Sequence, residues 1–258
     1  MVGRCGTAIG KRSGANEGIG NGRESHKDTP LVGAFFKIAW LVTRKDIRIE
    51  ARSWEMVSTT LFFAASCVLA FSFAFVREGR PVDGAAAGIV WIALAFSGTL
   101  ALGRAFERER YQDALRGLLM APVDRAAIYL GKFLGIVLLM AVVEAVVVVT
   151  VAFTFRAPLF VYPGYLAALL IPGTIGFAAV GTLFAAMLIR THSRGVLLPI
   201  LLYPVTFPVL IAGVGGTVAL LQAEPNLDLA RFWAAVLIFF DAVFLTLALW
   251  TFEPVMTE

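Results

Sequence analysis

Two acidic residues lie inside long apolar stretches, where a charged side chain needs a specific environment. Glu144 and Asp241 are each surrounded by apolar residues over a membrane-spanning length. An ionised carboxylate at that depth is costly unless a partner or water faces it. We expect Glu144 to make a structural polar contact, to pair with a basic group, to orient a subunit contact or to line a path. Asp241 could equally be a neutral, protonated acid bonded to another helix.

The histidines and cysteines do not form a set of ligands. His26 lies in a polar N-terminal tail and His192 in the short segment THSRG, so neither has the paired, enclosed setting of a haem ligand. Cys5 and Cys67 are far apart, and the sequence has no CxxCH motif that could attach haem covalently. We therefore expect no catalytic residue, no metal site and no firmly bound cofactor.

The sequence also lacks a nucleotide-binding motif. A P-loop has the pattern GxxxxGK[ST], in which backbone amides and the Lys hold phosphates and the hydroxyl binds magnesium. The two Gly-Lys pairs, at 10–11 and 131–132, are followed by Arg12 and Phe133 instead. If ATP drives this protein, a partner must bind it.

The most highly charged segment between two apolar runs covers residues 103–125, GRAFERERYQDALRGLLMAPVDR. Its apolar residues recur at three- and four-residue spacings before a proline stops the run, and they are Tyr111, Leu115, Leu118, Leu119 and Pro122. The pattern predicts a short amphipathic helix held below a membrane. Such a helix can lie on lipid, dock into a groove of a soluble partner, or merely connect two spans.

The composition indicates that membrane helices position these residues. Mean hydropathy is +0.82, and 59% of the residues are hydrophobic while 16% are charged, which leaves too little polar material to cover a soluble globule. The net charge of +4 does not indicate nucleic acid, because the basic residues lie between apolar runs and at their ends. Membrane topology explains that distribution better.

Six apolar runs are long enough to cross a bilayer, and they predict an all-α integral membrane protein. They cover Met56–Val76, Ala85–Leu102, Ala126–Phe155, Tyr165–Ile189, Val196–Leu221 and Phe232–Phe252, within a transmembrane domain of residues 56–252. The fifth run contains Pro199, Pro204 and Pro208. We expect this run to be kinked or re-entrant and buried against other helices, whether it moves during function or only packs.

The ends of the chain and its basic residues complete the organisation. Residues 1–30 are too polar to offset chain entropy and are expected to be disordered, while residues 253–258 form a short tail. Residues 31–55 predict an amphipathic helix on the cytoplasmic surface, suited to anionic lipid, or an ordinary juxtamembrane stop. With both termini in the cytoplasm, only four of the 22 Lys and Arg residues fall outside, as the positive-inside rule requires: Arg77, Arg80, Arg156 and Arg231.

Three ordered blocks of the sequence resemble one protein family. The first is GIVWIA at 88–93, the second runs from RAF at 104–106 and Glu109 through GLLMAPVDRAAIYLGK to Glu144, and the third is RGVLLPILLYPVTFPVLI at 194–211. Together they are similar to the heme exporter B family, CcmB, of cytochrome c maturation. The resemblance extends from Phe36 to Phe252, and only the N-terminal extension falls outside it.

The resemblance implies a six-span permease subunit with the ABC-2-type fold in an inner (cytoplasmic) membrane. Such a subunit exports haem or releases a haem-loaded chaperone and catalyses no reaction itself. The implied partners are a CcmA-like ABC ATPase, a CcmC-like haem-handling membrane subunit and a haem chaperone. Residues 104–122 would form the coupling segment that receives the motion of the ATPase, through Arg104, Phe106, Glu109 and the apolar face described above.

Two other functions are compatible with these residues. An ABC-2 permease for a lipid, a glycan or a drug would have the same fold, and its mutants would not specifically lack c-type cytochromes. A transporter or channel that needs no ATPase would work as the purified chain alone. The sparse charges within the membrane and the highly charged 103–125 segment argue mildly against the second alternative.

Overall fold

The computed structural model describes residues 31–77, 80–81, 84–111, 125–188 and 194–255. Long helices account for nearly all of these residues. The elements are α1 (Leu31–Ser53), α2 (Glu55–Phe75), β1 (Val76–Arg77), β2 (Arg80–Pro81), α3 (Ala85–Tyr111), α5 (Arg125–Phe155), α6 (Pro163–Met187), α7 (Arg194–Leu221) and α8 (Leu227–Val255). The two short strands pair antiparallel, with Val76 opposite Pro81 and Arg77 opposite Arg80.

Six helices, α2, α3, α5, α6, α7 and α8, are long and apolar enough to cross a membrane, as the sequence predicts. Large apolar side chains cover their outer surfaces, and Phe62, Phe73 and Phe153 are each more than three-quarters exposed. A soluble protein does not present so many large apolar groups to water, whereas lipid accommodates them. The chain is therefore a multi-pass membrane protein.

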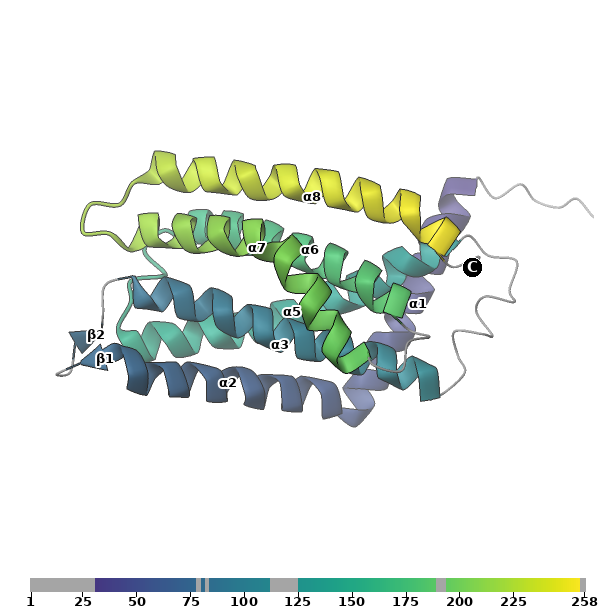
Figure 1. Cartoon of the computed structure of the whole chain (residues 1–258), viewed down its shortest axis with the longest axis horizontal. Helices are drawn as coiled ribbons and strands as arrows, with labels where there is room; N and C mark the ends of the chain where they lie inside the picture. The colour runs from purple at the N-terminus through teal and green to yellow at the C-terminus, as the bar shows by residue number, and fades with distance from the viewer. Residues whose placement is uncertain (1–30, 78–79, 82–83, 112–124, 189–193, 256–258) are drawn as a thin grey trace, which may run out of the picture.

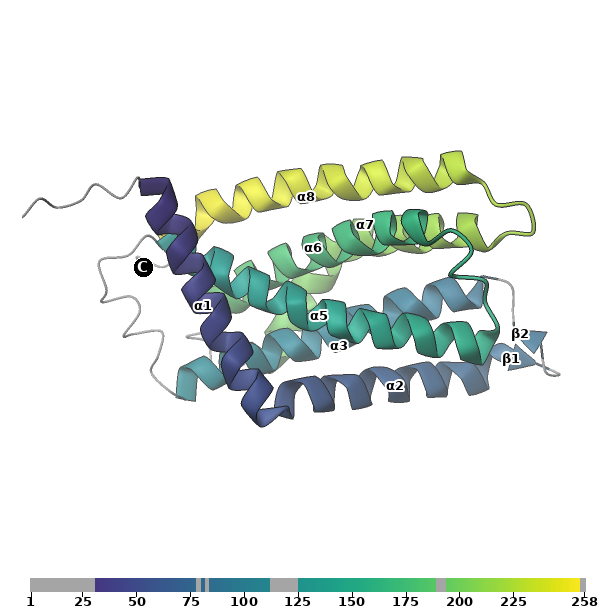
Figure 2. The same cartoon turned by 180° about the vertical axis from the view of Figure 1, so that it is seen from behind.

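The six spans run side by side along the long axis of the molecule, and α1 crosses one end of the bundle (Figures 1 and 2). We call this end the α1 end. The end of α8, the end of α3 and the start of α5 also lie there, while the β1–β2 hairpin lies at the opposite end (Figure 1). In the middle of the bundle, α6 packs against α3, α5, α7 and α8.

Local sequence signals begin two of the spans. The first helical residue of α6 is Pro163, whose fixed φ suits that position and whose missing N–H costs nothing there. At the start of α8, the side-chain oxygen of Asn226 accepts a hydrogen bond of 2.9 Å from the N–H of Leu229. This cap satisfies one of the backbone donors that a helix leaves unpaired at its N-terminus.

The structure describes α7 as one helix that bends along its length, and this excludes a re-entrant end (Figure 1). The bend fits the three prolines within the helix, each of which removes a backbone hydrogen bond. The expectation that this span is buried against other helices holds for one side only, because α7 packs against α3, α6 and α8 while Ile200, Phe207 and Ile211 are each more than half exposed. Pro204 and Pro208 are also exposed, which lipid tolerates because the proline ring is apolar and has no N–H to satisfy.

A second difference concerns the end of α3. The sequence predicts that the second span ends near Leu102 and that a separate amphipathic helix follows. In the structure α3 continues without interruption to Tyr111. Gly103 alone does not stop the helix, because the residues that follow it, Arg-Ala-Phe-Glu-Arg, are mostly good helix formers.

Candidate functional site

At the α1 end, α1 packs tightly against α5 through small side chains. The Thr43 hydroxyl lies 2.9 Å from the carbonyl oxygens of both Ala39 and Gly131 and donates to them. A Cβ atom added at Gly131 would lie 2.7 Å from the Ala39 carbonyl oxygen and 2.7 Å from the Cβ of Val42. No side chain therefore fits between the two helices at this point. We call the contact formed by Ala39, Val42, Thr43 and Gly131 the α1–α5 seam.

An ion pair joins the same two helices one residue further along α5. The Nζ of Lys132 lies 2.6 Å from Oδ2 of Asp46, and the Lys132 side chain is 9% exposed. Lys45 approaches the other oxygen of Asp46 at 3.1 Å. A buried ammonium group needs such a counterion. The sequence analysis missed Asp46, although a lysine within an apolar run was a signal that an acid had to lie nearby.

A single non-helical residue, Trp54, separates α1 from α2. Its φ is +54°, a left-handed conformation that costs a bulky residue about 1 kcal/mol. The carboxylate of Glu50 stabilises the turn because its Oε1 accepts a hydrogen bond of 2.8 Å from the N–H of Val57 in the first turn of α2. The turn therefore fixes the direction of α1 relative to the first span.

Two residues of the predicted coupling segment lie inside the bundle. The Arg104 guanidinium donates a hydrogen bond of 2.9 Å to Oγ1 of Thr59 and so connects α3 to α2. The Phe106 ring is 2% exposed and belongs to the main hydrophobic core. Both side chains hold α3 in place: Phe106 is buried, whereas Arg104 is partly exposed.

The other predicted coupling residues cannot be placed in the same way. The backbone of Glu109 and Tyr111 is part of α3, but their side chains are outside the described part of the structure. Leu115, Leu118, Leu119 and Pro122 lie outside the described residues altogether. The described part of α3 ends, and α5 begins, at the α1 end of the molecule (Figure 1). The docking role of the coupling segment stays a prediction.

The two intramembrane acids have different surroundings. Glu144 on α5 accepts a hydrogen bond of 2.6 Å from the Thr174 hydroxyl on α6, and both residues are buried. Asp241 on α8 is 8% exposed, and among the described residues its buried Oδ1 has no hydrogen-bond partner. A Cβ atom at Gly176 would lie 2.5 Å from that oxygen, so Asp241 faces the glycine surface of α6. The structure therefore does not bring the two acids into one polar network.

Sequence reasoning did not identify Trp91 as a structural residue, yet its side chain joins three spans. The indole Nε1 of Trp91 on α3 donates a hydrogen bond of 3.0 Å to Oγ1 of Thr217 on α7. A Cβ atom at Gly173 on α6 or at Gly213 on α7 would collide with the indole ring. The two glycines therefore form a slot for the ring. The sequence shows a tryptophan in one span and glycines in two others. It does not show that they meet, because that contact depends on the tertiary structure.

No group of three or more His, Cys, Asp and Glu side chains suited to a metal ion occurs within the described ranges. The described features of the α1 end are a packed seam, an ion pair and a turn stabilised by a side-chain hydrogen bond. These features connect α1 to α2 and α5, and Arg104 connects α3 to the same group.

Comparisons with known proteins agree on one family. The family model described as CcmB protein matches residues 37–256. A heme exporter protein B of Pseudomonas aeruginosa is 27% identical over 186 residues, which is 72% of this chain and 82% of that protein. The protein of the same name from Rhodobacter capsulatus is 28% identical over 171 residues, 66% of this chain and 77% of that protein. The one from Escherichia coli K12 is 26% identical over 96 residues, 37% of this chain and 44% of that protein.

Proposed function

The chain belongs to the CcmB family, and from this premise we propose that it is the membrane subunit of an ABC-type haem export system in cytochrome c biogenesis. The similar proteins carry the name heme exporter protein B, and the six spans suit a membrane subunit of a transporter. In this proposal the complex exports haem or releases a haem-loaded chaperone. The chain itself catalyses no reaction.

ATP hydrolysis is assigned to a separate CcmA-like ATPase, because the sequence has no P-loop. A CcmC-like membrane subunit and a haem chaperone complete the proposed complex. In this proposal the protein lies in the inner membrane, as the family implies, with both termini in the cytoplasm, an orientation that the distribution of Lys and Arg supports. The α1 end then faces the ATPase.

The α1–α5 seam is the observation that favours mechanical coupling at this end. A force applied to α1 passes to α5 through Gly131 and the Asp46–Lys132 pair, because both contacts are too close to allow the helices to slide freely. Arg104 joins α3 to α2 at the same level. A partner that binds residues 112–124 would therefore act on the ends of α3 and α5 at once.

The first experiment tests the pathway. The gene is deleted in a host that has no other cytochrome c maturation system, and membrane fractions on denaturing gels are stained for covalently bound haem. Loss of the stain, restored by a complementing copy, supports the proposal. Unchanged staining would overturn it and would favour export of a lipid, glycan or drug.

The second experiment tests ATPase docking with two matched variants. We expect Leu118→Glu to insert into the membrane normally but to lose the ATPase in co-purification, because it places a charge on the predicted apolar face. Met120→Glu adds the same charge on the opposite side of the predicted helix and serves as the control. Normal retention of the ATPase by Leu118→Glu would contradict docking through this face.

A further inference from the structure

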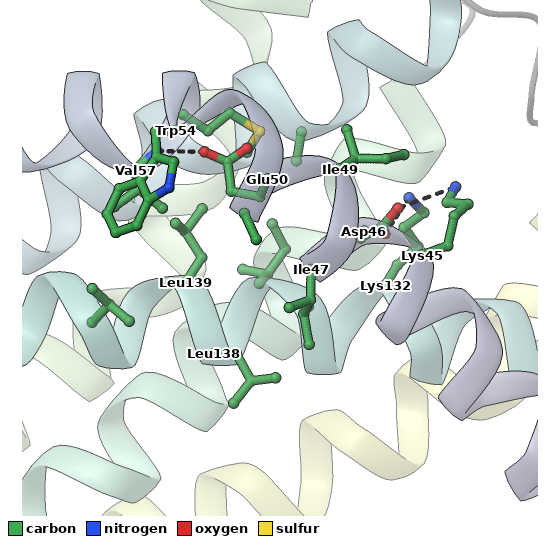
Figure 3. A pocket seen from close by; sticks show the side chains of 16 residues that line it. Lys45, Asp46, Ile47, Ile49, Glu50, Trp54, Val57, Lys132, Leu138 and Leu139 are labelled. Carbon is green, nitrogen blue, oxygen red and sulfur yellow. Dashed lines mark hydrogen bonds and ion pairs between the residues drawn. The ribbon is translucent and has the colours of Figure 1, made fainter.

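An apolar groove of about 410 Å³ opens between α1, α2 and α5 at the α1 end. Its lining changes in polarity from one side to the other. Lys45, Asp46 and Lys132 gather at one side, whereas Leu138 and Leu139 of α5 lie away from them (Figure 3). A site with a charged side and an apolar side suits an amphiphile better than a small polar ligand.

The groove has the depth of one lipid leaflet. From Lys132 to Val142 the α5 axis rises about 15 Å at 1.5 Å per residue, which is half of the roughly 30 Å hydrocarbon core. The α2 span begins at the apolar side of the groove, where Met56 and Val57 pack with Leu139, so the hydrocarbon core begins near this side and the charged side lies toward the headgroups. The apolar side lies at the depth where acyl chains are found.

The charge around the groove favours an anionic ligand. The α1 helix carries five basic and two acidic residues. Of the acids, Asp46 pairs with Lys132 and Lys45, and Glu50 accepts the hydrogen bond from the N–H of Val57. The basic residues Lys37, Arg44, Arg48 and Arg52 of the same helix are exposed. The lining itself balances Lys45 and Lys132 against Asp46 and Glu50, so the net positive charge of α1 comes from these exposed residues, as in segments that attract anionic lipid.

We propose that this groove binds one anionic phospholipid of the surrounding leaflet. Its phosphate lies beside Lys45, and one acyl chain runs along Ile47, Leu138 and Val142, which are 40%, 45% and 48% exposed in the chain by itself. The lipid covers these apolar surfaces and fills the space between α1 and α2. This site does not depend on the cargo of the transporter, so its test is separate from the test of haem export.

Native mass spectrometry of the purified full chain in mild detergent tests the proposal. Phosphatidylglycerol and phosphatidylcholine with identical acyl chains are added in equal amounts. We expect one tightly retained lipid per chain. Phosphatidylglycerol should be retained about fivefold more than phosphatidylcholine, because this ratio is the effect of one basic side chain near the headgroup. Equal retention of the two lipids would overturn the proposal.

Two pairs of variants locate the site. A Cβ atom at Gly135 would meet only Asp46, at 3.8 Å or more, so Gly135→Leu fills the groove without a backbone clash and should abolish the retained lipid. Gly195→Leu adds the same side chain in open space on α7 and should retain it. Lys45→Gln should remove the headgroup preference, whereas Lys37→Gln, which is outside the lining, should keep most of it. Unchanged lipid retention in Gly135→Leu would exclude this groove.

A second measurement avoids dependence on the folding of the Gly135→Leu variant. Phosphatidylglycerol with brominated acyl chains should quench the fluorescence of Trp54, which lines the groove, and the quenched fraction should fall in Trp54→Phe. Equal quenching in both proteins would overturn the proposal.

A Gly135→Leu protein that loses a partner membrane subunit but retains its lipid would show that the groove is a protein contact instead.

Discussion

Lys132 and Asp241 are both ionisable residues buried within spans, and their surroundings differ. Lys132 has the carboxylate of Asp46 at 2.6 Å, whereas the buried Oδ1 of Asp241 has no hydrogen-bond partner among the described residues. A charge that is paired across two helices adds a specific link between them. An acid in the second situation forms no such link among the described residues. We therefore regard the Asp46–Lys132 pair as a structural link between α1 and α5, and Asp241 as a residue that packs against the glycine surface of α6.

We expect Asp46→Asn to lower the free energy of unfolding by about 2 kcal/mol, because Lys132 keeps its buried ammonium group without that carboxylate. Asp228→Asn is the control, since the Asp228–Arg231 pair is largely exposed and should contribute less than about 0.5 kcal/mol. Thermal unfolding in detergent, followed by intrinsic fluorescence, measures both. Equal effects of the two substitutions would contradict the structural role of the Asp46–Lys132 pair.

The slot for Trp91 gives a second prediction at the residue scale. Gly173→Ala should destabilise the protein by about 2 kcal/mol, because the added methyl group occupies the space of the indole ring. Gly88→Ala adds the same group where no atom lies within 4 Å and should be nearly neutral. Combining Gly173→Ala with Trp91→Ala should cost less than the sum of the two single effects. Full additivity in the same unfolding measurement would show that the ring does not fill this slot.

At the scale of helices, α1 is more than an amphipathic helix that rests on lipid. Its outer surface is basic, but Ala39, Val42 and Thr43 are buried against α5. Close approach through small residues is a common way for membrane helices to associate, because packing and hydrogen bonds replace the hydrophobic effect. This arrangement allows α1 to transmit force instead of only marking the membrane surface.

We expect Gly131→Leu to separate α1 from α5 while leaving the six spans inserted, because the new side chain occupies the α1–α5 seam. Limited proteolysis of membranes should then cleave α1 at least several times faster, and covalent haem staining should fall in a complemented strain. Gly135→Ala, one turn further along the same helix, meets only ordinary contacts and is the control. Unchanged proteolysis and staining in Gly131→Leu would show that the seam is not required.

At the scale of the whole molecule, the two ends of the bundle differ in character. The α1 end has the seam, the Asp46–Lys132 pair and the ends of α3 and α5 (Figure 1). The opposite end consists of short turns and the β1–β2 hairpin (Figure 1). Contacts with soluble partners are therefore expected at the α1 end, provided that this end faces the cytoplasm.

Cysteine labelling tests that orientation. In a chain with Cys5 and Cys67 replaced by Ser, Gln222→Cys at the exposed α7–α8 turn should react with an impermeant thiol reagent added to intact spheroplasts. Arg52→Cys, exposed on α1, should react only after permeabilisation. The expectation rests on the excess of basic residues at the α1 end. The reverse pattern would place the termini outside and would contradict ATPase docking at α1.

The sequence by itself determined the membrane class, the six spans and the helix before them. These follow from the length and composition of apolar runs, since a bilayer requires about 20 apolar residues per helix and leaves few alternatives. The ends of the helices do not follow from the apolar runs alone. The continuation of α3 to Tyr111 depends on helix propensity and packing that no apolar run reveals.

Only the tertiary structure decided which residues meet. Glu144 lies opposite Thr174, Lys132 opposite Asp46, and Trp91 in a slot between Gly173 and Gly213, and each pair joins residues of different helices. Hydrophobic periodicity could not predict these pairs because lipid-facing and protein-facing sides of a span are almost equally apolar. The choice of partner depends on the rotation and crossing of each helix, which packing of all six spans fixes together.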